Sequence, residues 1–162
     1  MEKHAAITLA GQKARECEYI YHGCSQCVLM ALGAIFELEA DLLVKASSGL
    51  AGGIGRMHSV CGALLAGALA LGLKYGRGLN ELEDTDKLFR SMEHVEKLYR
   101  RFEEEFGSVV CREIRQMLLG EYIDTKIPEE YERAVKLGLY EKCSALVGRT
   151  AEIVAELMLE CR

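Results

Sequence analysis

Four cysteines, Cys24, Cys61, Cys111 and Cys143, lie far apart in the chain, yet each falls where the sequence predicts the start of a helix. A helix N-terminus carries unpaired backbone N–H groups and about half a positive charge, which stabilises a thiolate and lowers the pKa of a cysteine. Four thiols placed in this way indicate one shared site. They could bind a metal there, or Cys24 and Cys61 could act as redox thiols.

A fifth cysteine, Cys27, forms a CxxC motif with Cys24, and three-residue spacing puts both sulfurs on one face of a helix. A thioredoxin-like motif would follow a strand in an alternating pattern of strands and helices, and the sequence predicts no strand. Cys27 is equally well explained as a small core residue, and Cys17 and Cys161 look like ordinary helix-face positions.

The spacing of the cysteines limits the choice of metal. Structural zinc sites usually take their ligands from two close pairs, and this chain has only one such pair. Iron–sulfur ligation by four thiolates tolerates a distant ligand, although its compact motifs also use short spacings. The missing second pair disfavours zinc, but spacing alone does not decide between the metals.

The elements that must position these thiols are almost all helical. Apolar residues recur at three- and four-residue spacing, and glycines or capping residues separate the segments. The pair His22-Gly23 should end the first helix, with glycine in the left-handed conformation. Ser59 should cap the helix that holds Cys61, and Asn80 with Glu83 should form a capping box at the start of the longest helix. We expect helices over residues 5–21, 24–38, 41–46, 60–73, 80–107, 108–119, 129–137 and from 141 onward. The predicted fold is all-α: residues 1–162 form one helical domain, with a core of about 5–145 and a bundle of about six to seven helices.

A glycine-rich loop, residues 49–55, precedes the helix that carries Cys61. That helix repeats small residues every four positions, so a neighbouring helix can approach closely, and we expect it to be central. The backbone N–H groups of Gly52, Gly53 and Gly55 are candidates for binding a cofactor, because such nests bind anions. The loop lacks the ending of a P-loop, so its expected role is close backbone approach to the group held near Cys61.

The longest predicted helix carries a seam of apolar residues at alternating steps of four and three. The seam consists of Leu88, Met92, Val95, Tyr99, Phe102 and Phe106. An intramolecular bundle contact explains it best, because the regular run is shorter than a secure coiled coil requires. A homodimer through this helix is the alternative.

Charge and hydropathy exclude several classes of function. The net charge is −5 and no Lys/Arg stripe is present, which argues against binding nucleic acid. The most apolar stretch, residues 60–73, is too short for a membrane helix. The N-terminus does not resemble a secretory signal, so we expect a cytoplasmic protein, in which seven cysteines serve as thiols, metal ligands or redox groups rather than structural disulfides.

The segments 23–29, 49–56 and 60–63, together with the later Cys111 and Cys143, resemble the C_GCAxxG_C_C family of redox-active proteins. The likeness covers most of the chain, and the family cysteines fall on Cys24, Cys61, Cys111 and Cys143. Ala66 departs from the pattern, which has glycine there. The resemblance implies a small cytoplasmic helical protein with a cysteine-based redox role, but it does not name the reaction or the redox partner.

Three functions follow. In the first, the four thiolates hold a metal, with an iron–sulfur cluster favoured over zinc, and transfer electrons. In the second, a dithiol and disulfide pair, Cys24 with Cys61 or with Cys27, cycles without metal. In the third, the protein is a helical interaction domain whose cysteines are packing residues. His22 and His58 precede Cys24 and Cys61, and could serve the same site as ligands, proton carriers or hydrogen-bond donors.

Overall fold

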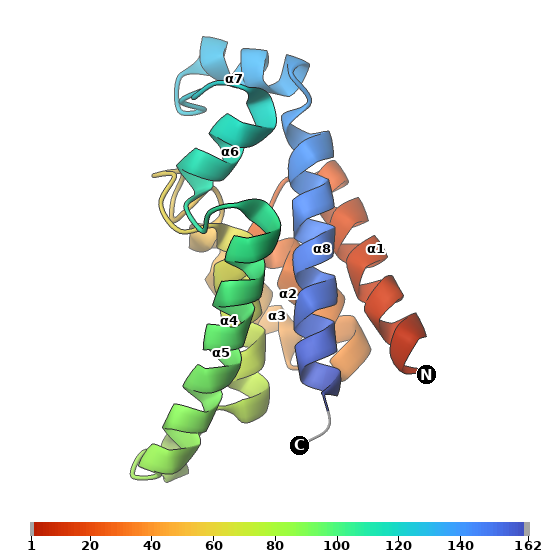
Figure 1. Ribbon diagram of the computed structural model, residues 1–162, viewed down its shortest axis with the longest axis vertical. Coiled ribbons are helices and arrows are strands. Elements are labelled where there is room, and N and C mark those ends of the chain that lie inside the picture. Colours follow the sequence, from red (N-terminus) through yellow and green to blue (C-terminus); the bar gives the residue numbers. More distant parts are fainter. Residues whose placement is uncertain (1, 161–162) are drawn as a thin grey trace.

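A computed structural model describes residues 2–160, and Cys161 lies outside them. Eight α-helices and two short 3₁₀ segments make up the described chain (Figure 1), and it contains no strand beyond one isolated bridge. The helices are α1 (Lys3–Tyr21), α2 (Cys24–Phe36), α3 (Ala40–Ala46), α4 (Gly62–Tyr75), α5 (Thr85–Phe106), α6 (Cys111–Leu119), α7 (Pro128–Lys136) and α8 (Leu139–Leu159). The 3₁₀ segments are η1 (Ser47–Leu50) and η2 (Leu79–Glu81). The all-α prediction is confirmed, and each of the eight predicted helical ranges overlaps one α-helix, although the bundle was expected to have about six to seven.

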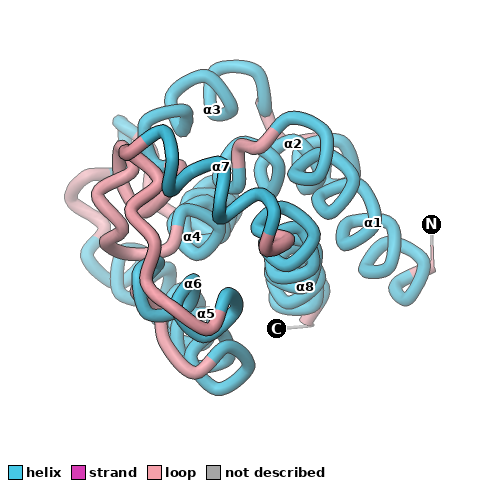
Figure 2. Tube along the Cα trace, turned by 90° about the horizontal axis from the view of Figure 1, so that it is seen from above, coloured by secondary structure: helices cyan, strands magenta, loops and turns pink. Residues whose placement is uncertain are grey.

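Helix α8 is the axis of the bundle. It packs against α1, α2, α4, α5, α6 and α7, and Figure 2 shows it between α1 and α4 when the molecule is seen from above. Its apolar face is almost completely buried, as at Val147, Ala151 and Val154. Small residues let α1 approach closely, because a Cβ added to Gly148 would lie 2.9 Å from the carbonyl oxygen of Gly11.

Helix α4 lies between α2, α5 and α8, as its small residues predict. Ala63, Ala66 and Ala70 are completely buried. A Cβ added to Gly67 would lie 2.8 Å from side-chain atoms of both Leu98 and Val154. Glycine at 67 therefore allows α5 and α8 to pack tightly against this helix, even though Ala66 occupies the neighbouring position.

The start of α5 differs from the prediction. Asn80 lies in η2, and α5 begins only at Thr85, where Asp84 caps it by accepting a hydrogen bond from the N–H of Lys87 at 2.7 Å. An aspartate at the cap position satisfies one of the unpaired N–H groups of the first turn. The capping-box interpretation of Asn80 was wrong, because a separate 3₁₀ turn precedes the helix.

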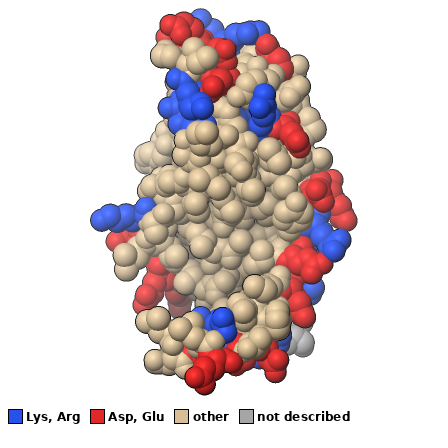
Figure 3. Space-filling model, turned by 90° about the vertical axis from the view of Figure 1, so that its left-hand side faces the viewer, with Lys and Arg blue, Asp and Glu red and all other residues tan. Residues whose placement is uncertain are grey.

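The buried face of α5 is also rotated from the predicted seam. Leu98 and Phe102 are completely buried, whereas Met92 and Tyr99 are 52% and 42% exposed. The intramolecular face thus uses only part of the seam. The side of the molecule seen in Figure 3 has a broad middle region with few charged side chains. A homodimer through α5 stays a prediction.

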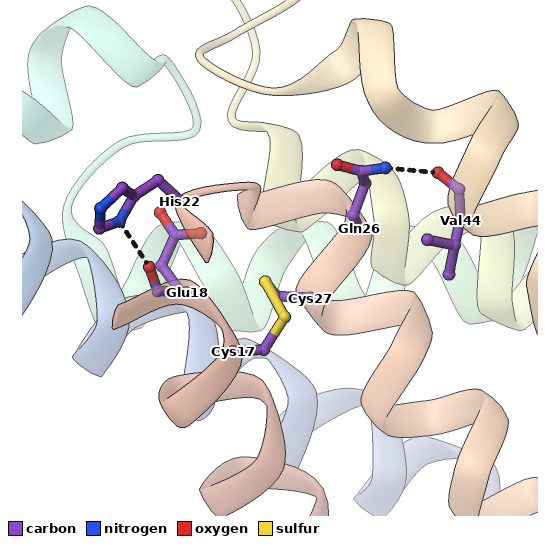
Figure 4. The surroundings of a disulfide bond; sticks show 6 residues. All are labelled: Cys17, Glu18, His22, Gln26, Cys27 and Val44. Carbon is purple, nitrogen blue, oxygen red and sulfur yellow. Dashed lines mark hydrogen bonds between the residues drawn. A yellow bond between two sulfur atoms is a disulfide. The ribbon is translucent and has the colours of Figure 1, made fainter. Parts of the chain in front are cut away.

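The expectation that the cysteines form no disulfide was wrong for Cys17 and Cys27. Cys17 of α1 and Cys27 of α2 form a disulfide, with their Cα atoms 5.4 Å apart (Figure 4). The two residues face each other across the α1–α2 hairpin, so the i, i+3 relation between Cys24 and Cys27 does not decide the partner of Cys27.

Within the described residues, no helix combines the length and the apolar character that crossing a membrane requires.

The position of Phe102 leads to a stability prediction. Its ring is completely buried and meets Phe106 edge-on. Phe102→Ala should lower the free energy of unfolding by about 3–5 kcal/mol, because it removes buried apolar surface and leaves a cavity. Phe89→Ala on the same helix is the control, since Phe89 is 56% exposed, and it should change stability by less than about 0.5 kcal/mol. Urea denaturation measures both; equal losses would contradict the packing described here.

Candidate functional site

All four predicted cysteines line one cavity of about 190 Å³. Cys61 and Cys111 are buried, and Cys24 and Cys143 are partly buried. The cavity lies where the N-terminal parts of α2, α4, α6 and α8 meet. Its other lining residues are Glu18, His22, Ala51, Gly52, Arg56, Ile114, Arg115, Thr125, Tyr131, Leu139, Tyr140, Leu146 and Val147. Chain folding therefore gathers four dispersed thiols at one place.

A short antiparallel bridge brings Cys61 and Cys111 together. Val60 pairs with Val110, the N–H of Cys61 donates to the carbonyl of Val109 at 2.8 Å, and the N–H of Cys111 donates to the carbonyl of Ser59 at 2.6 Å. Residues 59–61 are consequently extended, so Ser59 does not cap α4 as predicted. Cys61 itself is the N-cap residue of α4, and Cys111 is the first residue of α6.

Cys24 is the first residue of α2 and points toward the glycine loop and the start of α4. A Cβ added to Gly62 would lie only 2.7 Å from the Cys24 sulfur. The backbone N–H groups of Gly52 and Ser25 face that sulfur and act to lower its pKa. Glycine at 62 is thus required by the close packing of α4 against a cysteine of the site.

Cys143 comes from the other end of the chain. Helix α8 begins at Leu139 rather than near Glu141, so Cys143 lies in the second turn of the helix and not at its first N–H groups. Its thiol is close enough to Cys24 and Cys111 for their charges to raise its pKa. Cys143 therefore lines the same cavity as the other three cysteines, but it does not lie at a helix N-terminus as predicted.

The glycine loop forms a run of left-handed backbone. Five consecutive residues have positive φ: Gly52 (67°), Gly53 (71°), Ile54 (61°), Gly55 (59°) and Arg56 (63°). L-residues with side chains adopt this region at a cost of roughly 1–2 kcal/mol each, so Ile54 and Arg56 are strained. Such strain persists only where the surrounding structure fixes the conformation, and it concentrates at functional sites.

The three glycines proposed for cofactor binding differ in their positions. Gly52 lines the cavity, and Gly53 packs against Cys111, because an added Cβ would lie 2.8 Å from the Cβ of Cys111. Gly55 has no heavy atom within 4 Å of such a Cβ and does not line the cavity. The loop therefore approaches the site through Gly52 and Gly53.

His58 does not line the cavity but supports a residue that does. Nη1 of Arg115 donates to Nε2 of His58 at 3.0 Å and to the Thr125 hydroxyl at 3.1 Å, while Nδ1 of His58 lies 3.4 Å from the Tyr122 hydroxyl. Burial, and then the charge of Arg115, lower the pKa of His58, so the ring is neutral and accepts at Nε2. Burial raises the pKa of the Cys111 thiol, and the guanidinium of Arg115, which faces this thiol, opposes that effect.

Sequence analysis did not identify Arg115. It looked like one of many charged residues on a solvated helix, and the only signal was its position four residues after Cys111, which puts both on one face of α6.

Glu18 is the second residue that sequence analysis missed. It is 5% exposed, it lines the cavity, and its Oε2 atom has no hydrogen-bond partner among the described residues. Burial raises the pKa of Glu18 to about 7, against the opposing effect of the Gly23 N–H. This carboxyl adds negative charge beside Cys24 whenever it ionises.

His22 ends α1 in a left-handed conformation with φ 60°, whereas the sequence predicts this conformation at the next residue, Gly23. Its ring nitrogen Nδ1 donates to the Glu18 carbonyl at 3.0 Å (Figure 4). The ring also stacks on Tyr140, with centroids 3.4 Å apart, and the Tyr140 hydroxyl lies 2.7 Å from that of Tyr131. His22 therefore forms part of the cavity wall.

Burial reverses the predicted acidity of the thiols. It is the largest influence on all four, and it raises the pKa of Cys24 and of Cys143 to about 12. The pKa values of Cys61 and Cys111 are also raised, with the neighbouring sulfurs adding to the effect at Cys61. The helix N–H groups act in the predicted direction but are outweighed. Without a bound cation, the site therefore holds neutral thiols.

The donor atoms do not converge on one point. Among the described residues, no three His, Cys, Asp or Glu side chains lie close enough to hold a single metal ion. A group bound by all four sulfurs would have to be larger than one ion, or the sulfurs would have to move toward it.

Comparison with known proteins identifies one family. The sequence-family model described as "Putative redox-active protein (C_GCAxxG_C_C)" matches residues 22–157, which include the glycine loop and all four cysteines of the cavity. No curated protein and no solved structure matches the chain.

The raised thiol pKa values predict slow thiol chemistry in the metal-free protein. A raised pKa leaves less thiolate at a given pH, so alkylation of Cys24 and Cys143 should still be accelerating above roughly pH 10, whereas the rate for an unperturbed thiol is half-maximal at about pH 8.5 and has levelled off by then. Alkylation with iodoacetamide, followed by peptide mass spectrometry, measures each site, and the urea-unfolded chain is the control. An alkylation rate in the folded protein that is half-maximal near the unperturbed thiol pKa would contradict the prediction.

Two glycines of the loop provide a matched pair of variants. Gly55→Ala should cost only the left-handed conformation, about 1–2 kcal/mol. Gly53→Ala should cost roughly 1–3 kcal/mol more, because its Cβ would lie 2.6 Å from the Ser59 nitrogen and would press on Cys111. Thermal unfolding compares the two. Equal destabilisation would show that the loop does not pack on Cys111 as described.

Proposed function

Since the chain belongs to the C_GCAxxG_C_C family of redox-active proteins, we propose that Cys24, Cys61, Cys111 and Cys143 together bind an iron–sulfur cluster that transfers single electrons. The observation that supports this most directly is the lining of one cavity by all four sulfurs. We also propose that the protein acts in the cytoplasm, where such thiols stay reduced, with a redox partner still to be identified.

The chemistry of the donor set fits this group. Iron–sulfur clusters are held by cysteine thiolates, usually four. The cavity offers four cysteines and a predominantly apolar wall that includes Ile114, Leu146 and Val147. Because four buried thiolates are unstable without a compensating cation, the raised thiol pKa values are the expected state of such a site before metal binds.

Hydrogen-bond donors surround the sulfurs. Backbone N–H groups of Gly52 and Ser25 face Cys24, those of Ala63 and Leu64 face Cys61, and the Arg115 guanidinium faces Cys111. Donors to cysteine sulfur stabilise its negative charge, and they raise the reduction potential of a cluster. In this proposal the glycine loop and the start of α4 orient these donors, and His58 holds Arg115 in place.

The spacing of the ligands favours a cluster over zinc. A zinc ion needs four donors about 2.3 Å from one point, and the described side chains do not converge in this way. A cluster is a larger body whose irons bind the cysteines separately, and a cavity of about 190 Å³ has space for more than one ion.

Thiol and disulfide cycling without metal is the weaker alternative. Cys61 lies close enough to Cys24 for the charge of Cys24 to add to the effect of burial on its pKa, but the raised pKa values of both thiols leave little nucleophilic thiolate. The pairing of Cys24 with Cys27 is unavailable while Cys27 is bonded to Cys17. A pure interaction domain has no specific support, because packing residues would fill a cavity rather than line it.

The test is anaerobic purification or reconstitution with iron and sulfide. The wild-type protein should contain iron and labile sulfide and absorb visible light, and Cys111→Ala should lose most of the bound iron. Cys161→Ala is the matched control, because it removes a cysteine that the proposal does not use, and it should bind iron like the wild type. Metal analysis and electron paramagnetic resonance provide the readouts. A colourless protein after reconstitution, or one that binds only zinc, would refute the proposal.

A further inference from the structure

The Cys17–Cys27 disulfide is separate from the four-cysteine cavity, since neither residue lines it. The two residues differ in exposure. Cys17 is half-buried on α1, whereas Cys27 is 1% exposed in the core. Figure 4 shows the bond joining α1 to α2 beside Glu18. A reagent in solution can therefore reach the pair only from the side of Cys17.

Core packing holds α1 in place in addition to the disulfide. Ala10, Gly11 and Ala14 of α1 are buried, and this helix packs along α8 as well as α2. The two cysteines are ten positions apart, and a bond that closes so short a loop removes less entropy from the unfolded chain than one that closes a long loop. The packing against α8 does not depend on the disulfide, so we expect the helix pair to stay folded when the bond opens.

The pair lies next to the wall of the cavity on both helices. Cys17 directly precedes Glu18, whose carboxyl lines the cavity, and Cys27 lies one helical turn after Cys24. The chain between them contains His22, which also lines the cavity. A change in the state of the bond would thus act on the segment that supplies three residues of the site.

We propose that Cys17 and Cys27 form a second redox site of the protein, a reversible disulfide that exchanges with small thiols such as glutathione. This proposal goes beyond the iron–sulfur function and does not require it. It rests on the cytoplasmic location proposed above, since a disulfide in a cytosolic protein is usually transient, catalytic or redox-sensing rather than structural.

The exchange follows from the accessibility of the two sulfurs. A glutathione thiolate attacks Cys17 Sγ, the bond to Cys27 breaks, and Cys27 leaves as a thiolate that takes up a proton. A second glutathione thiolate attacks the glutathione sulfur of the mixed disulfide and releases Cys17 as a thiolate, which is also protonated. The pair gains two electrons and two protons, and two glutathione molecules become glutathione disulfide. Oxidation is the reverse of these steps.

The first experiment titrates the folded wild-type protein with mixtures of glutathione and glutathione disulfide. Samples are quenched in acid, alkylated and digested with chymotrypsin, because cleavage after Tyr19 and Tyr21 separates Cys17 from Cys24 and Cys27. The fraction of linked Cys17–Cys27 peptide should follow a single two-electron transition that is the same in both directions. Cys161→Ala should leave this transition unchanged.

Single variants test which sulfur is attacked. Cys27→Ser removes the buried partner, so glutathione disulfide should form a stable mixed disulfide at Cys17. Cys17→Ser leaves Cys27 in the core, and its glutathionylation should be at least tenfold slower. Intact mass measures both adducts, and circular dichroism checks that both variants are folded.

Three results would overturn the proposal. The bond could open only when the protein is unfolded, which would make it purely structural; fragmentation of the peptides could place the disulfide between Cys24 and Cys27, which lie on one chymotryptic peptide; or Cys27 could react as fast as Cys17. The Cys111→Ala variant separates this proposal from the previous one. It should lose iron but keep the Cys17–Cys27 transition, whereas a failure of that transition in iron-loaded wild-type protein would refute the second redox site alone.

Discussion

The site depends on a backbone contact between two segments about fifty residues apart in sequence. The bridge between Val60 and Val110, with its hydrogen bonds of 2.8 and 2.6 Å, makes the chain extended just before α4 and α6. Both helices therefore begin side by side, and Cys61 and Cys111 line the cavity from two adjacent extended segments. Without this contact, the two helices would have no reason to present their first residues to the same point.

The local features of the fold could be predicted from the sequence because they arise from neighbouring residues. Small residues in α4 predicted close packing, and they are buried as expected. The starts of α4 and α5 could not be predicted in the same way. Ser59 is a residue type that often caps helices, but the long-range bridge makes its segment extended. Asn80 lies in the 3₁₀ turn that precedes α5, and Asp84 caps the helix instead.

The membership of the site was predictable only in part. Cysteines are rare and chemically distinct, so their common position at helix starts was visible, whereas Glu18 and Arg115 resembled the other charged residues of the chain. The acidity of the thiols was predicted with the wrong sign. The N–H groups near Cys24 and Cys61 lower the thiol pKa values, as the helix starts predict. Tertiary packing removes water from the same sulfurs, and this desolvation raises the pKa values by more.

The same balance explains why the loop is strained. Burial disfavours thiolates, so under the proposed function, in which the site holds four of them, donors must be fixed at short range before the metal binds. The left-handed run from Gly52 to Arg56 places the N–H group of Gly52 at Cys24 and packs Gly53 on Cys111. Its cost, roughly 1–2 kcal/mol for each non-glycine residue, is small beside that of unpaired buried charge. The strain is therefore best understood as part of the construction of an electrostatic site, not as a consequence of helix packing.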